Sequence, residues 1–186
     1  MRKLKVQMQT SVDGFVAGIN DEMDWLTFDW DQALKQGVAN IMEPVDTILL
    51  GRKLAEGFIP HWASEPEYED PISIKWMNEM PKVVFSTTLT QIEWPNTRLA
   101  VGELTDEINK LKSLSGGDLI AYGGATFVAS LLKAGLVDEL NLFVNPVALG
   151  KGKSIFGLLE NPQQLKPICT KFFSCGITWL EFEVVR

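Results

Sequence analysis

Three short motifs in the sequence combine glycines, cations and hydroxyl groups, and each follows a predicted strand. One of them is the pair Gly123-Gly124, which separates the apolar stretch 118–122 from a predicted helix that starts at Ala125 and Thr126. Glycines let a ligand approach the backbone closely, and the N–H groups that open a helix bind anions with the help of the helix dipole. The motif therefore predicts a diphosphate site, and a tight turn without a ligand is the alternative.

The other two motifs add positive charge and hydroxyl groups. Gly51-Arg52-Lys53 follows the apolar run Thr47–Leu50, and Ser86-Thr87-Thr88 follows Val83–Phe85. An Arg side chain binds phosphate with two hydrogen bonds, and a Lys adds a point charge. A solvated Arg-Lys pair is the alternative for the first of these motifs. Because ligands of parallel sheets bind beyond the carboxyl ends of the strands, we expect all three motifs to converge on one crevice.

The elements that position these motifs alternate between strands and helices. Leu4, Val6 and Met8 alternate with polar residues, which predicts a half-buried first strand, and a long loop with turn residues follows it. A final pair of β segments turns at Gly176. This order favours a single α/β domain over residues 1–186, in which a mainly parallel sheet lies between helices and ends in an antiparallel hairpin. Helices are predicted over about 29–42, from 53 onward, and over 73–80, 106–114 and 125–134.

Composition excludes several other classes of protein. Seventeen Lys and Arg against 24 Asp and Glu give a net charge of −7, which disfavours binding to nucleic acid or to an anionic membrane. The apolar stretches are far shorter than the roughly 20 residues that cross a bilayer. Cys169 and Cys175 lie too far apart on one predicted strand for a disulfide, so we expect a cytoplasmic protein with reduced cysteines.

Other familiar motifs are absent or incomplete. One His and two distant Cys give no metal-binding spacing, so no metal site is predicted. Gly152-Lys153-Ser154 resembles the end of a phosphate-binding P-loop, but Val147 stands where that loop requires glycine. The first strand is not followed by the G-x-G-x-x-G pattern of a Rossmann domain. His61, the single histidine, is not favoured as a catalytic group because it lies in an acidic segment rich in proline and tryptophan.

Six segments together form a pattern that spans nearly the whole chain in a fixed order. The chain resembles the dihydrofolate reductase-like superfamily, in the bacterial branch related to the reductase domain of bifunctional riboflavin biosynthesis proteins. The resemblance implies a three-layer α/β/α fold and an NADPH-dependent reductase. The segments that carry it are Ser11–Gly18, Gly51–Phe58, Phe85–Thr88, Gly123–Ala125, Leu136–Leu140 and Pro146–Phe156.

The resemblance also implies how the cofactor is held. The turn Gly123-Gly124 and the following residues Ala125 and Thr126 bind the diphosphate. Gly51-Arg52-Lys53 and Ser86-Thr87-Thr88 then lie at the adenosine end and its 2′-phosphate. The chain departs from the pattern at Leu54, where related sequences often carry a threonine whose hydroxyl reaches the diphosphate.

The substrate side is less defined by the resemblance. Dihydrofolate reductases carry an acidic residue early in the first helix, after a loop, and Asp29 and Asp31 lie near that position. Asp13 is the third candidate acid, because a Ser-x-Asp-Gly motif is shared with the riboflavin-type reductases. Asp29 is also a plausible helix N-cap and Asp13 a plausible turn residue.

Three further residues are candidates for binding the substrate. Trp25 closes the first long loop and can stack on a flat ring, although a place in the core is the alternative. Lys151 and Lys153 can bind an acidic group of the substrate, and a solvated basic loop is the alternative.

The expected reaction is hydride transfer from the nicotinamide to a C=N or C=O bond. The expected substrate is a small heterocyclic or sugar-linked molecule similar to a riboflavin precursor or a pterin. The protein then contributes orientation, removal of water and a route for the proton. The alternative function is a nucleotide-binding protein of the same fold without efficient catalysis. The resemblance also implies a homodimer.

Overall fold

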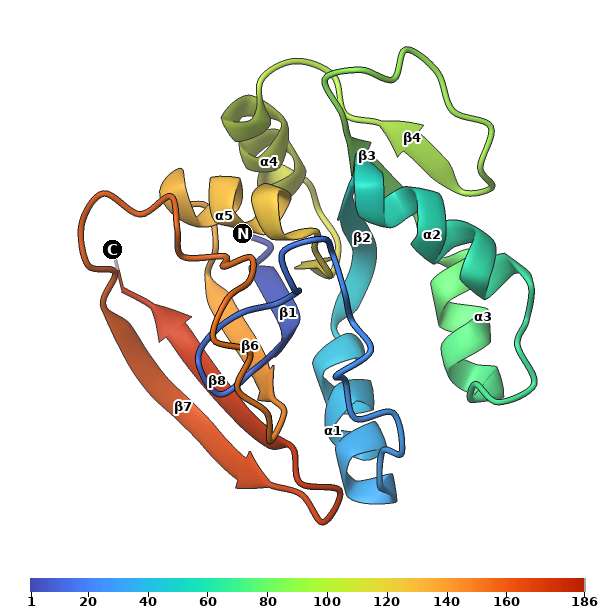
Figure 1. Cartoon of the computed structure of the whole chain (residues 1–186). Helices are drawn as coiled ribbons and strands as arrows, with labels where there is room; N and C mark the ends of the chain where they lie inside the picture. The colour runs from blue at the N-terminus through green and yellow to red at the C-terminus, as the bar shows by residue number, and fades with distance from the viewer. Residues whose placement is uncertain (186) are drawn as a thin grey trace.

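A twisted eight-stranded sheet with helices on both faces forms the centre of the protein (Figure 1). The computed structural model describes residues 1–185. The strands are β1 (Leu4–Thr10), β2 (Val45–Gly51), β3 (Lys82–Phe85), β4 (Thr97–Leu99), β5 (Asp118–Ala121), β6 (Glu139–Val144), β7 (Leu165–Phe172) and β8 (Thr178–Val184), and the helices are α1 (Gln32–Met42), α2 (Arg52–Ala63), α3 (Pro71–Glu79), α4 (Leu104–Ser113) and α5 (Ala125–Lys133).

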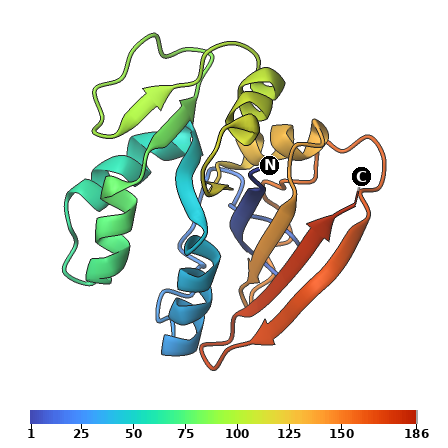
Figure 2. The same ribbon diagram turned by 180° about the vertical axis from the view of Figure 1, so that it is seen from behind.

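The strand order is β4-β3-β2-β5-β1-β6-β8-β7. The first six of these strands are parallel, β8 runs antiparallel to β6, and β7 pairs antiparallel with β8 to form a hairpin. The first strand of the chain is central, with Val6 opposite Ala121 on one side and Leu140 on the other. Figures 1 and 2 show the hairpin at one end of the sheet and β4 near the other. The predicted α/β class with a mainly parallel sheet and a C-terminal hairpin is confirmed.

Two apolar cores separate the three layers. Alternate residues of each strand point to opposite faces, so Leu49 and Val83 pack with α4 and α5, whereas Ile48, Leu50 and Val84 pack with α1, α2 and α3. The wholly apolar middle of β2 is buried because helices cover both of its faces. The α/β/α layering follows from these two cores.

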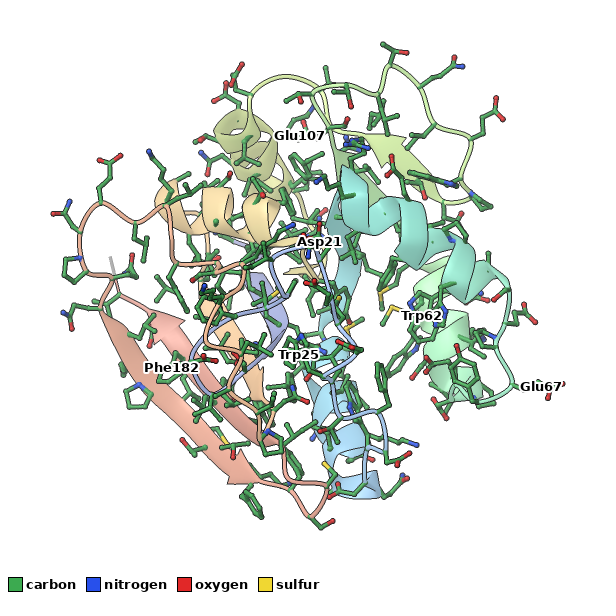
Figure 3. The ribbon with its side chains drawn as sticks, viewed as in Figure 1. Asp21, Trp25, Trp62, Glu67, Glu107 and Phe182 are labelled. Carbon is green, nitrogen blue, oxygen red and sulfur yellow. The ribbon has the colours of Figure 1, made fainter. Side chains whose placement is uncertain are left out.

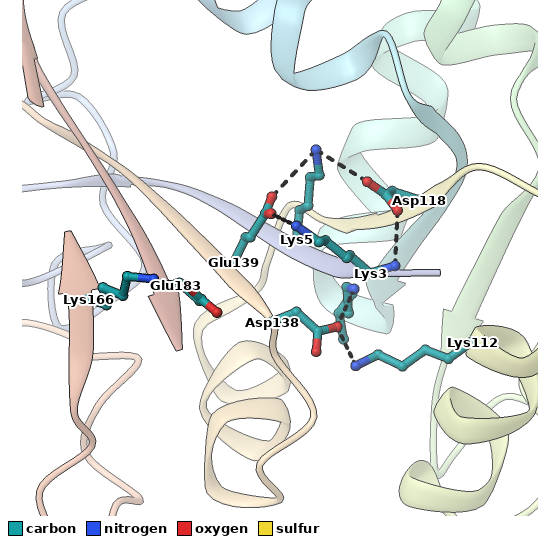
Figure 4. Close-up of polar contacts among 9 residues, drawn as sticks. Lys3, Lys5, Lys112, Asp118, Asp138, Glu139, Lys166 and Glu183 are labelled. Atoms are coloured by element: carbon teal, nitrogen blue, oxygen red, sulfur yellow. Dashed lines mark hydrogen bonds and ion pairs between the residues drawn. The ribbon is translucent and has the colours of Figure 1, made fainter. Parts of the chain in front are cut away.

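Ion pairs hold the amino ends of the central strands together (Figure 4). The ammonium group of Lys5 lies 3.3 Å from a carboxylate oxygen of Asp118 and 3.5 Å from one of Glu139. The Lys112 ammonium makes a 2.5 Å ion pair with Asp138. Charges therefore occupy this end of the sheet, opposite the edge at which β1, β2, β3, β5 and β6 finish.

No helix within residues 1–185 has both the length and the apolar character needed to cross a membrane.

Candidate active site

The starts of α2 and α5 lie side by side at the carboxyl edge of the sheet. The backbone N–H of Gly51 donates to the carbonyl of Gly123 at 3.1 Å. A Cβ atom on Gly51 would lie only 3.5 Å from the backbone nitrogen of Gly124. Gly51 and Gly124 are the N-cap residues of α2 and α5, respectively, and the peptide bond between Gly123 and Gly124 is cis. Two of the three predicted anion-binding motifs are therefore in direct contact.

Both helix starts leave their backbone donors unused by side chains of the described chain. Gly51 and Gly124 provide no side-chain cap, and neither α2 nor α5 carries an acidic residue in its first turn. In contrast, Asp31 caps α1 and Asp70 caps α3. The free N–H groups and the positive dipole end of a helix attract anions. The two adjoining helix starts thus have the chemistry that a diphosphate requires.

At this point the chain leaves two adjacent strands in opposite directions. β2 and β5 are neighbours, but α2 packs with the core that contains α1 and α3, whereas α5 packs with α4 on the other face of the sheet. Open α/β sheets bind their ligands at such switch points. The topology therefore places the glycine motifs where a ligand site is expected.

The cations next to Gly51 differ in their surroundings. Arg52 is half-buried, and its guanidinium donates to Glu56 one turn along α2 at 2.7 Å. Lys53 is exposed. Both begin at the first turn of α2, so they lie at the rim where the resemblance predicts the 2′-phosphate. Leu54 reaches towards the glycine pair, since its Cδ2 would lie 3.5 Å from a Cβ on Gly123.

The serine-threonine motif lies on the neighbouring strand. Phe85 is opposite Gly51 in the parallel pairing of β3 with β2, so Ser86 starts at the same edge. The hydroxyl oxygen of Ser86 accepts the N–H groups of Thr88 at 3.1 Å and of Leu89 at 2.9 Å. Ser86 therefore shapes the turn, whereas the exposed side chains of Thr87 and Thr88 are open to a ligand.

Asp13 joins two loops. Its carboxylate accepts the Ser11 hydroxyl at 2.6 Å and the backbone N–H groups of Leu149 at 3.1 Å and Gly150 at 2.7 Å. These bonds, with that from Ser11 the largest cause, lower the pKa of the Asp13 carboxyl to about 2. Asp13 is therefore ionised at neutral pH and holds no proton to donate.

The two acids before α1 have different roles in the structure. The predicted helix start at Asp29 is wrong, because α1 begins at Gln32 and Asp31 is its N-cap. The Asp31 carboxylate accepts the Leu34 N–H at 2.8 Å and the Ser174 hydroxyl at 2.6 Å, and these bonds lower the pKa of Asp31 to about 2. Asp29 is exposed. Of the three candidate acids, Asp13 and Asp31 are thus engaged in holding loops and Asp29 is not seen in such a contact.

The loop over 11–31 is attached to the loop over 145–153 by backbone hydrogen bonds. Val12 donates to Val147 at 2.8 Å, and Ala17 and Lys153 form an isolated antiparallel bridge. Gly152 permits this close crossing, because a Cβ there would clash with the backbone of Ala17. Lys153 also pairs with Asp21, whereas Lys151 is exposed. The candidate lysines therefore lie on a loop that is fixed to the one that carries Trp25.

Trp25 is half-buried within the first loop rather than in the core. Its indole N–H donates to the carbonyl of Glu22 at 3.0 Å. Figure 3 labels Trp25 and Asp21 on this loop, in front of the central strands. The indole thus lies on the first loop, and its stacking on a substrate stays a prediction.

Asn145 positions the first loop and was not singled out from the sequence. It is fully buried at the end of β6, its amide oxygen accepts the Thr27 N–H at 2.9 Å, and its amide nitrogen donates to Gln9 at 2.8 Å. The signal in the sequence is an amide side chain directly before Pro146, where a strand ends at the expected rim. An Asn there is common in any loop, so the pattern alone does not reveal its role.

Among residues 1–185, the structure brings together no group of three His, Cys, Asp or Glu side chains that would hold a metal ion. The donors near the starts of α2 and α5 are instead backbone amides, cations and hydroxyl groups.

Several known proteins are similar to this chain in sequence. The uncharacterized protein YyaP of Bacillus subtilis (strain 168) is 34% identical over 187 residues, which cover 97% of this chain and 94% of YyaP. The uncharacterized protein YwjB of the same organism is 24% identical over 189 residues and covers 95% of each chain.

Solved structures share the fold. A putative riboflavin biosynthesis protein from Shewanella sp. PV-4 is similar with a TM-score of 0.75 at 23% identity, covering 99% of both chains. Dihydrofolate reductase from Enterococcus faecalis, in complex with NADP(H), gives a TM-score of 0.61 at 14% identity over 99% of this chain and 97% of that chain. The dihydrofolate reductase-like fold predicted from the sequence is thereby confirmed. The model of the RibD C-terminal domain matches residues 2–179, and the chain belongs to this family.

Proposed function

We propose that the protein is an NADPH-dependent reductase that transfers a hydride to a C=N or C=O bond of a small heterocyclic or sugar-linked substrate. The substrate is expected to be similar to a riboflavin precursor or a pterin. The observation that carries the proposal is the contact between the starts of α2 and α5, whose N-caps are both glycine. Membership of the RibD C-terminal domain family supports a reductase.

The residues at the adjoining helix starts fit the cofactor. Backbone N–H groups at Gly124, Ala125 and Thr126 are suited to the diphosphate because no side chain caps α5. Arg52 and Lys53 at the first turn of α2 are suited to the 2′-phosphate. Bound NADPH supplies the hydride, and the chain supplies binding and orientation.

The substrate side is formed by the two joined loops. Trp25 offers an aromatic face, and Lys151 offers an exposed cation for an acidic group of the substrate. Asp13 and Asp31 fix the loops that frame this side. Because Asp13 and Asp31 are ionised, neither carboxyl supplies the proton for the reduced bond, which then comes from solvent or from the substrate itself.

The alternative function is nucleotide binding without efficient catalysis. It is favoured by the engagement of Asp13 and Asp31 in loop contacts, which leaves neither carboxyl poised as an acid. NADPH binding without oxidation of NADPH in the presence of pterins, riboflavin precursors and simple carbonyl compounds would support this alternative.

Titration with NADPH and NADH tests the cofactor site. Fluorescence of the tryptophans and energy transfer to the reduced nicotinamide report binding. We expect Arg52→Ala to weaken NADPH binding about tenfold or more, the cost of losing a hydrogen bond to a charged group, and to affect NADH much less. Lys166→Ala is the matched control, because Lys166 is an exposed cation on β7 that pairs with Glu183.

Two results would count against the proposal. If neither nucleotide bound at millimolar concentration, the reductase assignment would fail despite the fold. If Arg52→Ala and Lys166→Ala weakened NADPH binding equally, the effect of Arg52 would be one of net charge, and the 2′-phosphate would lie elsewhere.

A further inference from the structure

Two phenylalanine rings stack on each other at the carboxyl edge of the sheet. Phe85 is the last residue of β3, and Phe127 lies in the first turn of α5. The ring centroids are 4.9 Å apart, and the ring planes are inclined by 28°. Both residues are half-buried, so part of each side chain remains accessible to a ligand. The pair therefore offers a flat aromatic surface that two separate elements hold in place.

The start of α2 lies directly against this aromatic pair. Phe85 is opposite Gly51 in the parallel pairing of β3 with β2. A Cβ atom on Gly51 would lie 2.9 Å from the Cβ of Phe127 and 3.5 Å from the backbone nitrogen of Gly124. Gly51 and Gly124 are the N-cap residues of the two helices proposed to bind the phosphate groups of the cofactor. The aromatic surface is thus a direct neighbour of both helix starts.

A second aromatic pair lies on the opposite face of the sheet. Phe58 of α2 stacks on Tyr122 with 5.6 Å between ring centroids. This pair packs with the core that contains α1, α2 and α3, whereas Phe85 and Phe127 pack with the core that contains α4 and α5. The two pairs are equally aromatic, but only Phe85 and Phe127 share their face with the start of α5. The second pair is therefore a natural control for the first.

A purine nucleotide has the chemistry that fits a flat aromatic surface beside two anion-binding helix starts. Bases stack on aromatic side chains through their π faces, and a purine with its two fused rings offers more stacking area than a pyrimidine. The phosphate groups of the same molecule are the ligands proposed for the starts of α2 and α5. One nucleotide can therefore use both features at once.

We propose that Phe85 and Phe127 form the subsite for the purine base of the bound nucleotide. The inference deepens the proposed function and rests on it for the position of the phosphate groups. The phosphates supply affinity that does not depend on the base, and the two rings supply the preference for a purine. The exposed side chains of Thr87 and Thr88 follow Phe85 by two and three residues, so they lie at the border of this subsite.

Titration with ADP and with UDP separates the base from the phosphates, because the two ligands share the ribose diphosphate. Phe127→Leu keeps the Cβ and Cγ atoms that lie nearest to Gly51 and removes only the aromatic ring. We expect Phe85→Leu and Phe127→Leu each to bind ADP about threefold to tenfold more weakly than the wild type, the usual effect of losing one aromatic contact. Binding of UDP is expected to change by less than about twofold. Calorimetric titration measures both ligands.

The matched control is Phe58→Leu, which makes the same change in the pair on the other face. We expect this variant to bind ADP as the wild type does. Phe85→Tyr keeps an aromatic ring and is expected to retain the preference for ADP over UDP that Phe85→Leu loses. Because Phe85 and Phe127 belong to different elements, each Leu variant gives an independent measurement should the other fold poorly.

Three results would overturn the inference. ADP binding could be unchanged in both Leu variants, ADP and UDP could weaken equally, or Phe58→Leu could lose as much ADP binding as the other two. In each case NADPH binding to the wild type would leave the proposed function standing. Conversely, a selective loss of ADP binding, in a protein that binds NADPH but oxidises it with none of the substrates tested, would support the inference and count against a reductase.

Discussion

A Cβ atom on Gly51 would lie 2.9 Å from the Cβ atom of Phe127, well inside the distance at which two such atoms pack. The φ of Gly51 is −73°, which any residue adopts, so the glycine is required by packing and not by backbone conformation. Phe127 belongs to the first turn of α5 and stacks on Phe85 with 4.9 Å between ring centroids. Phe127 thus supports the start of α5 and also leaves no room for a Cβ atom on Gly51 at the start of α2.

Replacement of Gly51 by Ala is expected to destabilise the protein and to weaken cofactor binding together. The added methyl pushes α5 away from the end of β2, with a loss of about 1–3 kcal/mol in the free energy of unfolding. Gly57→Ala is the control, since Gly57 is exposed within α2 and a Cβ there meets nothing within 4 Å. That change is expected to stabilise the protein by about 0.5–1 kcal/mol.

Urea denaturation of both variants, followed by tryptophan fluorescence, checks these signs. An unchanged free energy of unfolding for Gly51→Ala would mean that the start of α5 moves at little cost. That result would contradict the close packing of Gly51 against Phe127.

The stability of the protein is expected to fall at low pH through Asp13. The pKa of this carboxyl is lowered from 3.8 to about 2 in the folded protein, first by the Ser11 hydroxyl and then by the Leu149 N–H. A carboxyl with a lower pKa in the folded state stabilises that state above its unfolded pKa, and the contribution is lost as the pH falls through the folded pKa. We therefore expect this loss between about pH 4 and pH 2.

Melting temperatures measured from pH 6 to pH 2 test this expectation. Asp13→Asn should give a flatter profile than the wild type, whereas Asp24→Asn should give a profile parallel to it. Parallel profiles for both variants would show that the contacts of Asp13 do not persist in solution.

Asn145→Ala is expected to destabilise the protein and to loosen the first loop. The substitution leaves the amide group of Gln9 and the N–H of Thr27 without their partner, which costs about 1–3 kcal/mol. Limited proteolysis should then cut within 11–31 faster than in the wild type. Asn145→Asp keeps the acceptor for the Thr27 N–H and is the control. Cutting of the Ala variant at the wild-type rate would contradict this role of Asn145.

Removal of the Lys5 ammonium is expected to be costly, because Lys5 lies between two carboxylates at the end of the sheet. Its side chain is 12% exposed, and those of Asp118 and Glu139 are 20% and 10% exposed. Lys5→Met removes the cation between Asp118 and Glu139, although Lys3 still pairs with Glu139, and the expected loss in the free energy of unfolding is about 3 kcal/mol.

The matched change on the surface is Lys166→Met. It breaks the exposed ion pair with Glu183 and is expected to alter the free energy of unfolding by less than about 1 kcal/mol. Equal losses in the two variants would show that burial does not govern these ion pairs.

The positions of the strands along the chain were predictable because strands that are buried on both faces have apolar runs in the sequence. Ile48, Leu49 and Leu50 are apolar, and the structure buries all three completely. The glycine motifs were predictable for a similar local reason, since each stands between a strand and a helix. The contact of Gly51 with Gly123 needed the topology, which places β2 beside β5.

The contacts of the candidate acidic residues could not be predicted from local sequence patterns. Asp29 and Asp31 both fit an N-cap, and the choice of Asp31 depends on Ser174, which lies 143 residues away. The bonds of Asp13 to the loop at Leu149 and Gly150 likewise depend on distant residues. The homodimer and the roles of the site residues stay predictions, because they concern molecules other than this single chain.

The central position of β1 in the sheet has a consequence for folding during synthesis on the ribosome. The strand is made before its partners β5 and β6, which lie more than a hundred residues later in the chain. Contacts of such long range slow folding, and apolar segments wait exposed in the meantime. The strand β1 therefore has to remain unpaired until β5 and β6 have been made, and the glycine motifs at the carboxyl edge of the sheet cannot come together before β5 pairs with β2.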